Sequence, residues 1–451
     1  MKKEVSKNHN SKNIDDKVKK SLKYSVISGS FYGVTDGTGN SYISPFAIAM
    51  NASNNEIAML SSIPNLIGPL SELGTTKAIE KLKGRKKVVM LSALLQSFIL
   101  IPILLIPFLF LQNGPIILIA LFSLYAIFGF FLGPALTSWM GDLVPENERG
   151  IFFGNRGRII GFITLVASLA AGFFLDIFPK NRVFIGFSIL FLVAFLARLA
   201  SVYFMGKKYE PKLVLKKKLQ FSFIEFLKKM PFNNFGKFAI YSSLINFAVY
   251  VAAPFFSVYM LKDLQLSYTK YTIAIITSGV ATLIGLPLWG KFGDKYGNIR
   301  ALKICGFLIP LVPLLWVFSS NFYYIILIQI YAGLVWSGFN LSTTNFIFDS
   351  TSVQRRATCD AYNTILMGFG AFVGATLGGY LATNLEISFM NVFFFIFIVS
   401  TILRFSISAI MLPKIKEVRK VKRTALLDII GISHNRGFAH RTVDWYQPKK
   451  K

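Results

Sequence analysis

Long apolar runs are the feature of this chain that most restricts its fold. Twelve of them are about as long as the ~20 residues that a helix needs to cross ~30 Å of hydrocarbon. They cover residues 24–49, 55–77, 88–111, 115–140, 151–175, 183–206, 238–261, 268–290, 301–318, 322–347, 359–383 and 388–412. Charged residues make up only 16% of the chain, whereas a soluble protein has about 25%. We therefore predict an all-α membrane protein with twelve transmembrane helices.

The positive charge lies between these runs. The formal net charge is +28, and the basic residues gather before residue 24, at 83–87, at 207–237 and after residue 413. Twelve spans place all four regions on one side of the membrane, and basic loops stay on the cytoplasmic side. We predict a multi-pass protein of the cell membrane with both termini in the cytoplasm. Since this charge reflects topology, nucleic acid is not expected as a partner.

Several classes of chemistry find no support in the sequence. Cys305 and Cys359 lie in or beside apolar segments, and His9, His434 and His440 lie in the polar tails, so neither a disulfide framework nor a metal site is expected. The chain has no G-x-x-x-x-G-K-[ST] loop and no G-x-S-x-G elbow, which disfavours an ATP-driven pump and a soluble-type catalytic site. We predict a protein that is not an enzyme and has no cofactor.

An internal repeat divides the chain into two halves. A shift of about 207 residues places Asp142 on Asp349 and Arg149 on Arg356. We predict two pseudo-symmetric six-helix bundles at residues 24–206 and 238–412. A cytoplasmic N-terminal tail (1–23), a basic linker (207–237) and a basic C-terminal tail (413–451) complete the chain.

The linker between the halves has two possible structures. Lys216, Lys217 and Lys218 precede a run of aromatic and aliphatic residues that Lys228 and Lys229 close. Such a pattern suits a short basic amphipathic helix on the anionic lipids of the inner leaflet. A plain solvated linker is the equal alternative.

One motif between the eighth and ninth runs is specific. The stretch at 290–300 reads GKFGDKYGNIR, with Gly290, Asp294, Lys295, Gly297 and Arg300 at spaced positions. It resembles the G-x-x-x-D-[RK]-x-G-x-x-[RK] signature of the major facilitator superfamily. Glycines allow a tight turn, and an aspartate with basic side chains can form a breakable latch. The resemblance implies a secondary transporter that works by alternating access.

The first-half copy of this signature is degenerate. Gly84 and Arg85 remain, but Lys81 occupies the aspartate position. We therefore expect the gating bonds of the second half to be the stronger ones.

A second motif enters the fifth run as Asp142 to Gly150, with Arg149 before the glycine. It resembles the [DE]-x-x-P-x-x-x-R-G segment of the same superfamily, and Asp349 with Arg356 repeats it. The resemblance implies an ion-pair network in which Asp294 and Arg356 form part of the inner gate. Ordinary juxtamembrane charges, each contributing under ~1 kcal/mol, are the alternative.

An ionisable side chain inside a membrane span costs free energy, and its presence there therefore indicates a functional role. Asp36 lies thirteen residues past Lys23, which is about 20 Å along a helix, near the membrane midplane. We predict that Asp36 binds the coupling proton and that Arg158, with Arg156 one turn shallower, is its partner or anchors an anionic solute. Glu72 is a second acceptor. Arg198 and Arg404 are expected to extend toward the inner membrane surface.

Polar uncharged residues complete the predicted cavity. In the first half they surround Asp36, and in the second half they are scattered over three spans. They are Tyr32, Asn40, Tyr241, Asn246, Tyr250, Trp336, Asn340 and Asn363. Hydrogen-bonding groups with aromatic rings suit a sugar, a peptide or an amphipathic solute.

Together these features predict a monomeric transporter of a small solute, a proton-coupled symporter for uptake of a sugar-like compound, an organic anion or another metabolite. Uptake is favoured slightly because Val166 to Gly172 and the glycines near Gly379 lack the proline that antiporters carry in such stretches. Two alternatives remain: an exporter that exchanges its solute for protons, and a sensor or lipid-handling protein that keeps the fold without transport.

Overall fold

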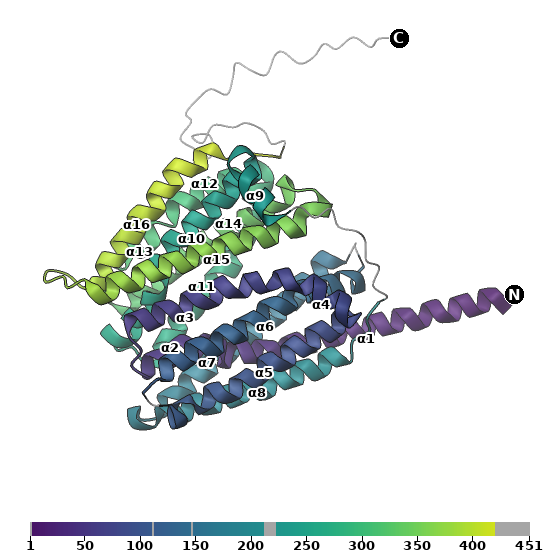
Figure 1. The fold of residues 1–451 in the computed structure, drawn as a ribbon, viewed down its shortest axis with the longest axis horizontal. Coiled ribbons are helices and arrows are strands. Elements are labelled where there is room, and N and C mark those ends of the chain that lie inside the picture. Colours follow the sequence, from purple (N-terminus) through teal and green to yellow (C-terminus); the bar gives the residue numbers. More distant parts are fainter. Residues whose placement is uncertain (1, 111, 146–147, 212–221, 420–451) are drawn as a thin grey trace, which may run out of the picture.

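A computed structural model describes residues 2–110, 112–145, 148–211 and 222–419, with side chains described outside 1–15, 353–354 and 357. The predicted tail from residue 420 and the lysines at 216–218 lie outside the described residues. The described chain is helical almost throughout, and its helices form two bundles (Figure 1).

The first bundle is built from eight helical segments. They are α1 (Lys2–Thr38), α2 (Ile43–Ala49), α3 (Asn54–Ser71), α4 (Thr75–Leu82), α5 (Arg85–Leu109), α6 (Gly114–Leu143), α7 (Arg149–Asp176) and α8 (Val183–Gly206). Helix α1 packs between α7 and α8, and α5 packs between α6 and α8.

The linker contains the short helix α9 (Phe223–Lys229), and the second bundle follows it. The helices of this bundle are α10 (Asn234–Val258), α11 (Tyr268–Tyr296), α12 (Asn298–Leu308), α13 (Leu311–Leu315), α14 (Phe322–Ser350), α15 (Val353–Asn384) and α16 (Val392–Met411). Helix α10 packs against α15 and α16, and α11 packs against α14. Between the bundles, α3 packs against α15 and α7 against α11.

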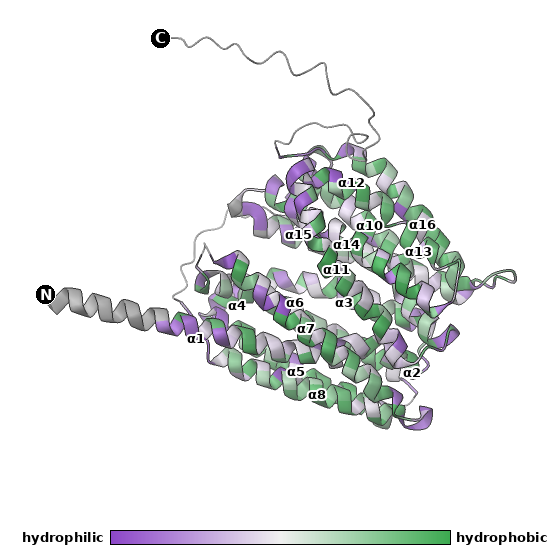
Figure 2. Ribbon diagram, turned by 180° about the vertical axis from the view of Figure 1, so that it is seen from behind, coloured by the Kyte–Doolittle hydropathy of each residue, from purple (hydrophilic) through white to green (hydrophobic). Residues whose placement is uncertain are grey.

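Ten helical stretches of the described chain are long and apolar enough to cross a membrane. The first two predicted spans correspond instead to interrupted helices. A 3₁₀ turn at Asn40–Tyr42 separates α1 from α2, and another at Glu72–Gly74 separates α3 from α4. The ninth span is also broken, because Pro310 has no N–H to continue α12. Hydrophobic residues run along the helices, and hydrophilic ones gather toward their ends (Figure 2).

The two ends of the bundles differ in how they are joined. We call the end that carries residues 207–211 and 412–419 the tail end, and the opposite end, with residues 39–53 and 259–267, the far end. At the far end the Tyr42 hydroxyl lies 2.7 Å from Thr272 Oγ1, and Lys262 Nζ donates to Ala52 O at 2.7 Å. Asp176 accepts from the backbone N–H of Tyr268 at 2.8 Å. These bonds join the two bundles at the far end.

Arg404 shows how a buried charge can serve the fold. It does not extend to the membrane surface as expected, because its side chain is 2% exposed. Its guanidinium donates to Ile309 O at 3.4 Å and to Val249 O at 3.3 Å. Ile309 lies at the break between α12 and α13, where a carbonyl loses its helical partner. Arg404 therefore stabilises the broken helix.

Candidate functional site

A cavity of about 650 Å³ extends from the tail end toward the middle of the molecule. All but two of its lining residues belong to the first bundle. They are Gly29, Tyr32, Asp36, Gln96, Gly129, Leu132, Leu136, Arg156, Gly157, Ile160, Gly161, Thr164, Leu165, Arg198 and Met205, joined by Gly279 and Leu283 of α11. The volume is within the range of about 300–1,000 Å³ typical of small-molecule sites.

Asp36 faces this cavity from α1. It is half-buried, and its Oδ1 accepts a hydrogen bond of 2.8 Å from Asn40 Nδ2. Tyr32 lines the same cavity one turn earlier on α1. Within the polar cluster at 32–40, Tyr32 and Asp36 thus form one edge of the cavity, whereas Asn40 is not among the lining residues and is connected to it through its bond to Asp36.

The cation beside this cluster is Arg198, for which the sequence predicts a position at the membrane surface. Its side chain is 2% exposed, its guanidinium carbon lies 4.8 Å from the centre of the Tyr32 ring, and Nη2 donates to Gln96 Oε1 at 2.5 Å. The Tyr125 hydroxyl is also buried, within electrostatic range of Arg198 and close to Asn40. Arg198 thus belongs to the polar cluster and not to the membrane surface.

Arg156, and not Arg158, lines the cavity from α7. Arg158 is exposed, and no ion pair with Asp36 forms among the described residues. The two arginines differ by two positions, or about 200° around a helix, so only one of them can face α1. Arg156 Nε donates to Ser25 O at 3.3 Å and to Ser25 Oγ at 3.2 Å.

A glycine on α1 makes room for Arg156. A Cβ built on Gly29 would lie 3.1 Å from Arg156 Nη2 and 2.3 Å from Ile160 Cδ1. A larger side chain there would displace both residues, so Gly29 brings α7 and its arginine close to α1.

Glu72, the second predicted acceptor, lies outside the cavity lining. It is in the 3₁₀ turn after α3, within electrostatic range of Asp360 on α15. The two carboxyl groups come from different bundles, so Glu72 stays a candidate for a second proton site.

The polar residues predicted in the second bundle lie away from this cavity. Tyr241 is buried with its hydroxyl 3.5 Å from Ser408 Oγ, and Asn246 donates to Ser242 O on its own helix. Tyr250 lies near Asn65 of α3, in the other bundle.

The remaining three residues of this set also lie outside the cavity lining. Trp336 packs edge-on against Phe339 with ring centres 5.5 Å apart, and Asn340 is exposed. Asn363 is buried and donates to the sulfur of Met367. The first bundle therefore supplies the polar side of the cavity.

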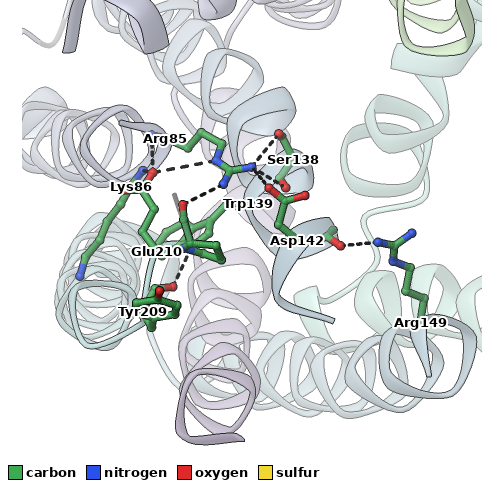
Figure 3. Close-up of polar contacts among 10 residues, drawn as sticks. Arg85, Lys86, Ser138, Trp139, Asp142, Arg149, Tyr209 and Glu210 are labelled. Atoms are coloured by element: carbon green, nitrogen blue, oxygen red, sulfur yellow. Dashed lines mark hydrogen bonds and ion pairs between the residues drawn. The ribbon is translucent and has the colours of Figure 1, made fainter. Parts of the chain in front are cut away.

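At the tail end of the first bundle, Arg85 forms an ion pair that the degenerate motif did not lead us to expect. Arg85 is 1% exposed, and its Nη1 lies 2.6 Å from Asp142 Oδ2 (Figure 3). The same nitrogen donates to Ser138 O at 3.0 Å. Gly84, in extended conformation just before α5, lies against Glu210, whose Oε2 would be 3.3 Å from a Cβ there.

Glu210 completes this cluster from beyond α8. Its Oε1 accepts from the backbone N–H of Arg85 at 2.6 Å and of Lys86 at 3.1 Å, which satisfies two free donors at the start of α5. Trp139 Nε1 donates to Tyr209 O at 2.9 Å (Figure 3). The beginning of the linker is therefore fixed to the tail end.

The second bundle has a comparable cluster with a different cation. Arg419 lies 2.8 Å from Asp349 Oδ2 and 3.1 Å from Asp294 Oδ1, and these two carboxylates raise its pKa. Asn298 Nδ2 also donates to Asp349, at 2.7 Å. The expected pairing of Asp294 with Arg356 does not form, because Arg356 donates to Phe348 O and lies over the Phe348 ring.

The motif aspartate of the second bundle forms a weaker pair than expected. Asp294 is 78% exposed, whereas Arg85 of the first bundle is buried, and screening by water weakens an exposed pair. The better shielded carboxylate of the second bundle is Asp349, which is 16% exposed.

The other residues of the 290–300 motif lie around the junction of α11 and α12. Gly297 takes φ 97°, a left-handed conformation that favours glycine, and so separates α11 from α12. Gly290 and Lys295 remain inside α11, Arg300 lies in the first turn of α12, and Lys295 Nζ lies 4.9 Å from the Tyr296 ring centre.

The second motif begins α7. Arg149 is its first residue and donates from Nη2 to Gly141 O at 2.6 Å. A Cβ on Gly150 would meet nothing within 4 Å among the described atoms, so close packing does not explain this glycine.

Sequence reasoning did not identify Gln96, Arg198, Glu210, Glu417 or Arg419 as site residues. A signal for two of them was present, because the shift of 207 residues that pairs Asp142 with Asp349 also pairs Glu210 with Glu417. No comparable signal marks Gln96, which is one polar residue in an apolar run.

Comparison with curated proteins finds transporters. The chain is 24% identical to the multi-drug resistance efflux pump PmrA of Streptococcus pneumoniae over 59% of its own length and 65% of that protein. It is also 24% identical to the multidrug resistance protein MdtG of Proteus mirabilis, over 69% and 75% of the two chains. The chain thus matches just under two thirds of the length of PmrA.

Comparison with solved structures finds the same fold. A D-xylose-proton symporter superposes with a TM-score of 0.67 at 14% identity, covering 89% of this chain and 99% of that one. The nucleoside transporter NupG gives a TM-score of 0.64 at 14% identity over 89% of this chain and 100% of that one.

The family model described as Major Facilitator Superfamily matches residues 26–251 and again 238–437, which together cover most of the chain. From residue 26 onward, both bundles described above fall within these matches. The chain therefore belongs to the Major Facilitator Superfamily of membrane transporters.

Proposed function

We propose that this protein is a proton-coupled secondary transporter that moves a small organic solute by alternating access, with Asp36 as the proton-binding carboxylate. The observation that carries the proposal is the half-buried Asp36, which faces a cavity of about 650 Å³. An ionisable side chain at that depth is costly to keep, and proton coupling gives it a function.

The conformation supports an alternating mechanism. Hydrogen bonds such as that of Tyr42 with Thr272 join the bundles at the far end, while the cavity extends from the tail end, where Met205 and Leu136 line it, to Asp36. With the basic tail end in the cytoplasm, this is an inward-facing state. Rocking the bundles would break the far-end bonds and expose Asp36 to the other side.

Two directions of transport have support. Export in exchange for protons is favoured by the names of the matched relatives, PmrA and MdtG, which are a drug efflux pump and a drug resistance protein. Uptake with protons is the second candidate, since Val166 to Gly172 carries no proline.

The test uses protein reconstituted in liposomes with an internal pH dye and a panel of sugars, amino acids, organic anions and cationic drugs. We expect at least one solute to move protons with wild type and not with Asp36→Asn. The sign of the pH change on solute addition separates exchange from symport. Solute binding without any flux of solute or protons would contradict the proposal and favour a sensor with the same fold.

A further inference from the structure

We propose that the cavity selects a solute with an anionic group, such as a carboxylate, sulfonate or phosphate, on an apolar body. The inference rests on the proposed transport function and names the class of solute. It follows from the balance of charge on the cavity wall and from the partners that the charged side chains already have.

The cavity wall carries more positive than negative charge. Arg156 and Arg198 line it with two guanidinium groups, and Asp36 supplies one carboxylate. The wall is therefore cationic with Asp36 ionised, and more so when Asp36 is protonated. Among the hydrogen bonds and ion pairs of the described residues, none joins Asp36 to either arginine, and Asp36 Oδ1 instead accepts from Asn40.

Arg198 is the cation with the least compensation. It is 2% exposed, its Nη2 bonds the neutral Gln96, its face lies over the Tyr32 ring, and its Nε has no partner among the described residues. A buried ion without an opposite charge costs several kcal/mol. An anion in the cavity would supply that charge and accept from a planar donor group suited to carboxylate and phosphate.

Arg404 shows that burial alone does not make such a site. It follows Arg198 by 206 residues and is equally buried, but it donates to the carbonyls of Ile309 and Val249 and is not among the cavity-lining residues. The two related arginines therefore differ in surroundings. Of the two, Arg198 lines the cavity described above and Arg404 does not.

The rest of the wall suits an apolar body. Leu132, Leu136, Ile160, Leu165 and Leu283 supply aliphatic surface. On α7, a Cβ on Gly157 or Gly161 would meet nothing within 4 Å among the described atoms, so the backbone itself forms a smooth part of the wall. An apolar ring could lie there with its anionic group at the arginines.

The test compares three probes with the same ring: 2-naphthoate, methyl 2-naphthoate and 2-naphthylmethylammonium. Their binding to the full chain in nanodiscs is measured by titration calorimetry at pH 7.5. We expect 2-naphthoate to bind at least tenfold more tightly than the other two. Arg198→Gln should remove this preference, Arg198→Lys should keep part of it, and Arg404→Lys is the control for altering a buried arginine outside the cavity.

Two results would overturn the inference: wild type binding the ester or the ammonium probe as tightly as 2-naphthoate, or showing no binding of 2-naphthoate. Because the ranking is measured on wild type, it does not depend on the folding of a variant. Absence of the anion preference in wild type, with intact proton coupling, would contradict only this inference. An intact preference without any solute-driven proton movement would contradict only the proposed function.

Discussion

Glu210 and Glu417 cap corresponding helices from corresponding positions. Glu210 Oε1 accepts from the backbone N–H of Arg85 at the start of α5, and Glu417 Oε2 accepts from the N–H of Ile299 at the start of α12. The two glutamates lie 207 residues apart, the repeat of the two bundles. One is at the beginning of the linker and the other is in the C-terminal tail, so each segment fixes the tail end of the bundle that precedes it.

Replacing Glu210 by alanine should destabilise the first bundle. The carboxylate has two backbone donors and is near the buried Arg85, and a hydrogen bond to a charged group contributes about 1.5–3 kcal/mol. We expect a clear decrease in the melting temperature in detergent. Glu80→Ala, at an exposed glutamate near the same turn, is the control, and equal decreases would show that Glu210 has no capping role.

The two latches should respond differently to loss of a carboxylate. Asp142→Asn removes the anionic partner of a buried arginine. We expect the free energy of unfolding to fall by about 1–3 kcal/mol. This is less than for a fully buried pair, because Asp142 is 51% exposed. Asp294→Asn should cost under ~1 kcal/mol, as for surface pairs. Chemical denaturation of the two variants measures the difference, and a larger effect at Asp294 would restore the motif-based expectation.

Lys208 links stability to pH. It is 1% exposed, its Nζ lies 4.8 Å from the Trp139 ring centre, and burial, with Arg156 and Lys86 nearby, lowers its pKa to about 7 from 10.5. The folded protein thus holds fewer protons here than the unfolded chain between pH 7 and 10.5. The free energy of unfolding should therefore increase as the pH rises through that window, because of Lys208.

Lys208→Met should remove this dependence. We expect the variant to melt several degrees higher than wild type at pH 6, where the buried lysine is charged, and to lose most of that gain at pH 9.5. Melting curves at both pH values check it, with the exposed neighbour Lys207→Met as control. A gain that is the same at both pH values would indicate a packing effect and not titration.

A large residue at Gly172 should prevent closure of the far end. A Cβ there would lie 2.9 Å from Thr272 Oγ1, 3.0 Å from the Tyr42 hydroxyl and 3.1 Å from Tyr268 O. We expect Gly172→Leu to increase labelling of a cysteine placed at Thr164 by an impermeant maleimide added on the far-end side. Gly133→Leu, where a Cβ meets nothing within 4 Å among the described atoms, should leave labelling at the wild-type level, and equal labelling of both variants would contradict this account.

The sequence predicted the helices well because membrane burial leaves a strong compositional signal. The predicted span 183–206 coincides with α8 (Val183–Gly206). Prediction and structure differ where a helix does not end at the same residue as its apolar run. Helix α11 continues past Gly290 to Tyr296, because a helix can leave the hydrocarbon and ends here only where Gly297 adopts a positive φ.

The partners inside the site were harder to predict. Depth along a span follows from counting residues, but the direction of a side chain depends on how the helix is rotated. Thus Asp36 and Arg156 line the cavity, whereas Arg158 does not, and Arg198, which is predicted at the membrane surface, lines it as well. Arg419 was missed because its partners Asp294 and Asp349 are over sixty residues earlier in the chain, and a basic tail carries no sign of such contacts.

The most direct test of the central claim is to separate solute exchange from proton-driven accumulation in Asp36→Asn. Liposomes containing wild type or the variant are loaded with a solute that wild type transports. Exchange of labelled for unlabelled solute is then compared with accumulation driven by a pH gradient. We predict that the variant retains exchange but loses the response to the gradient. Accumulation by the variant at the wild-type level would contradict Asp36 as the coupling site.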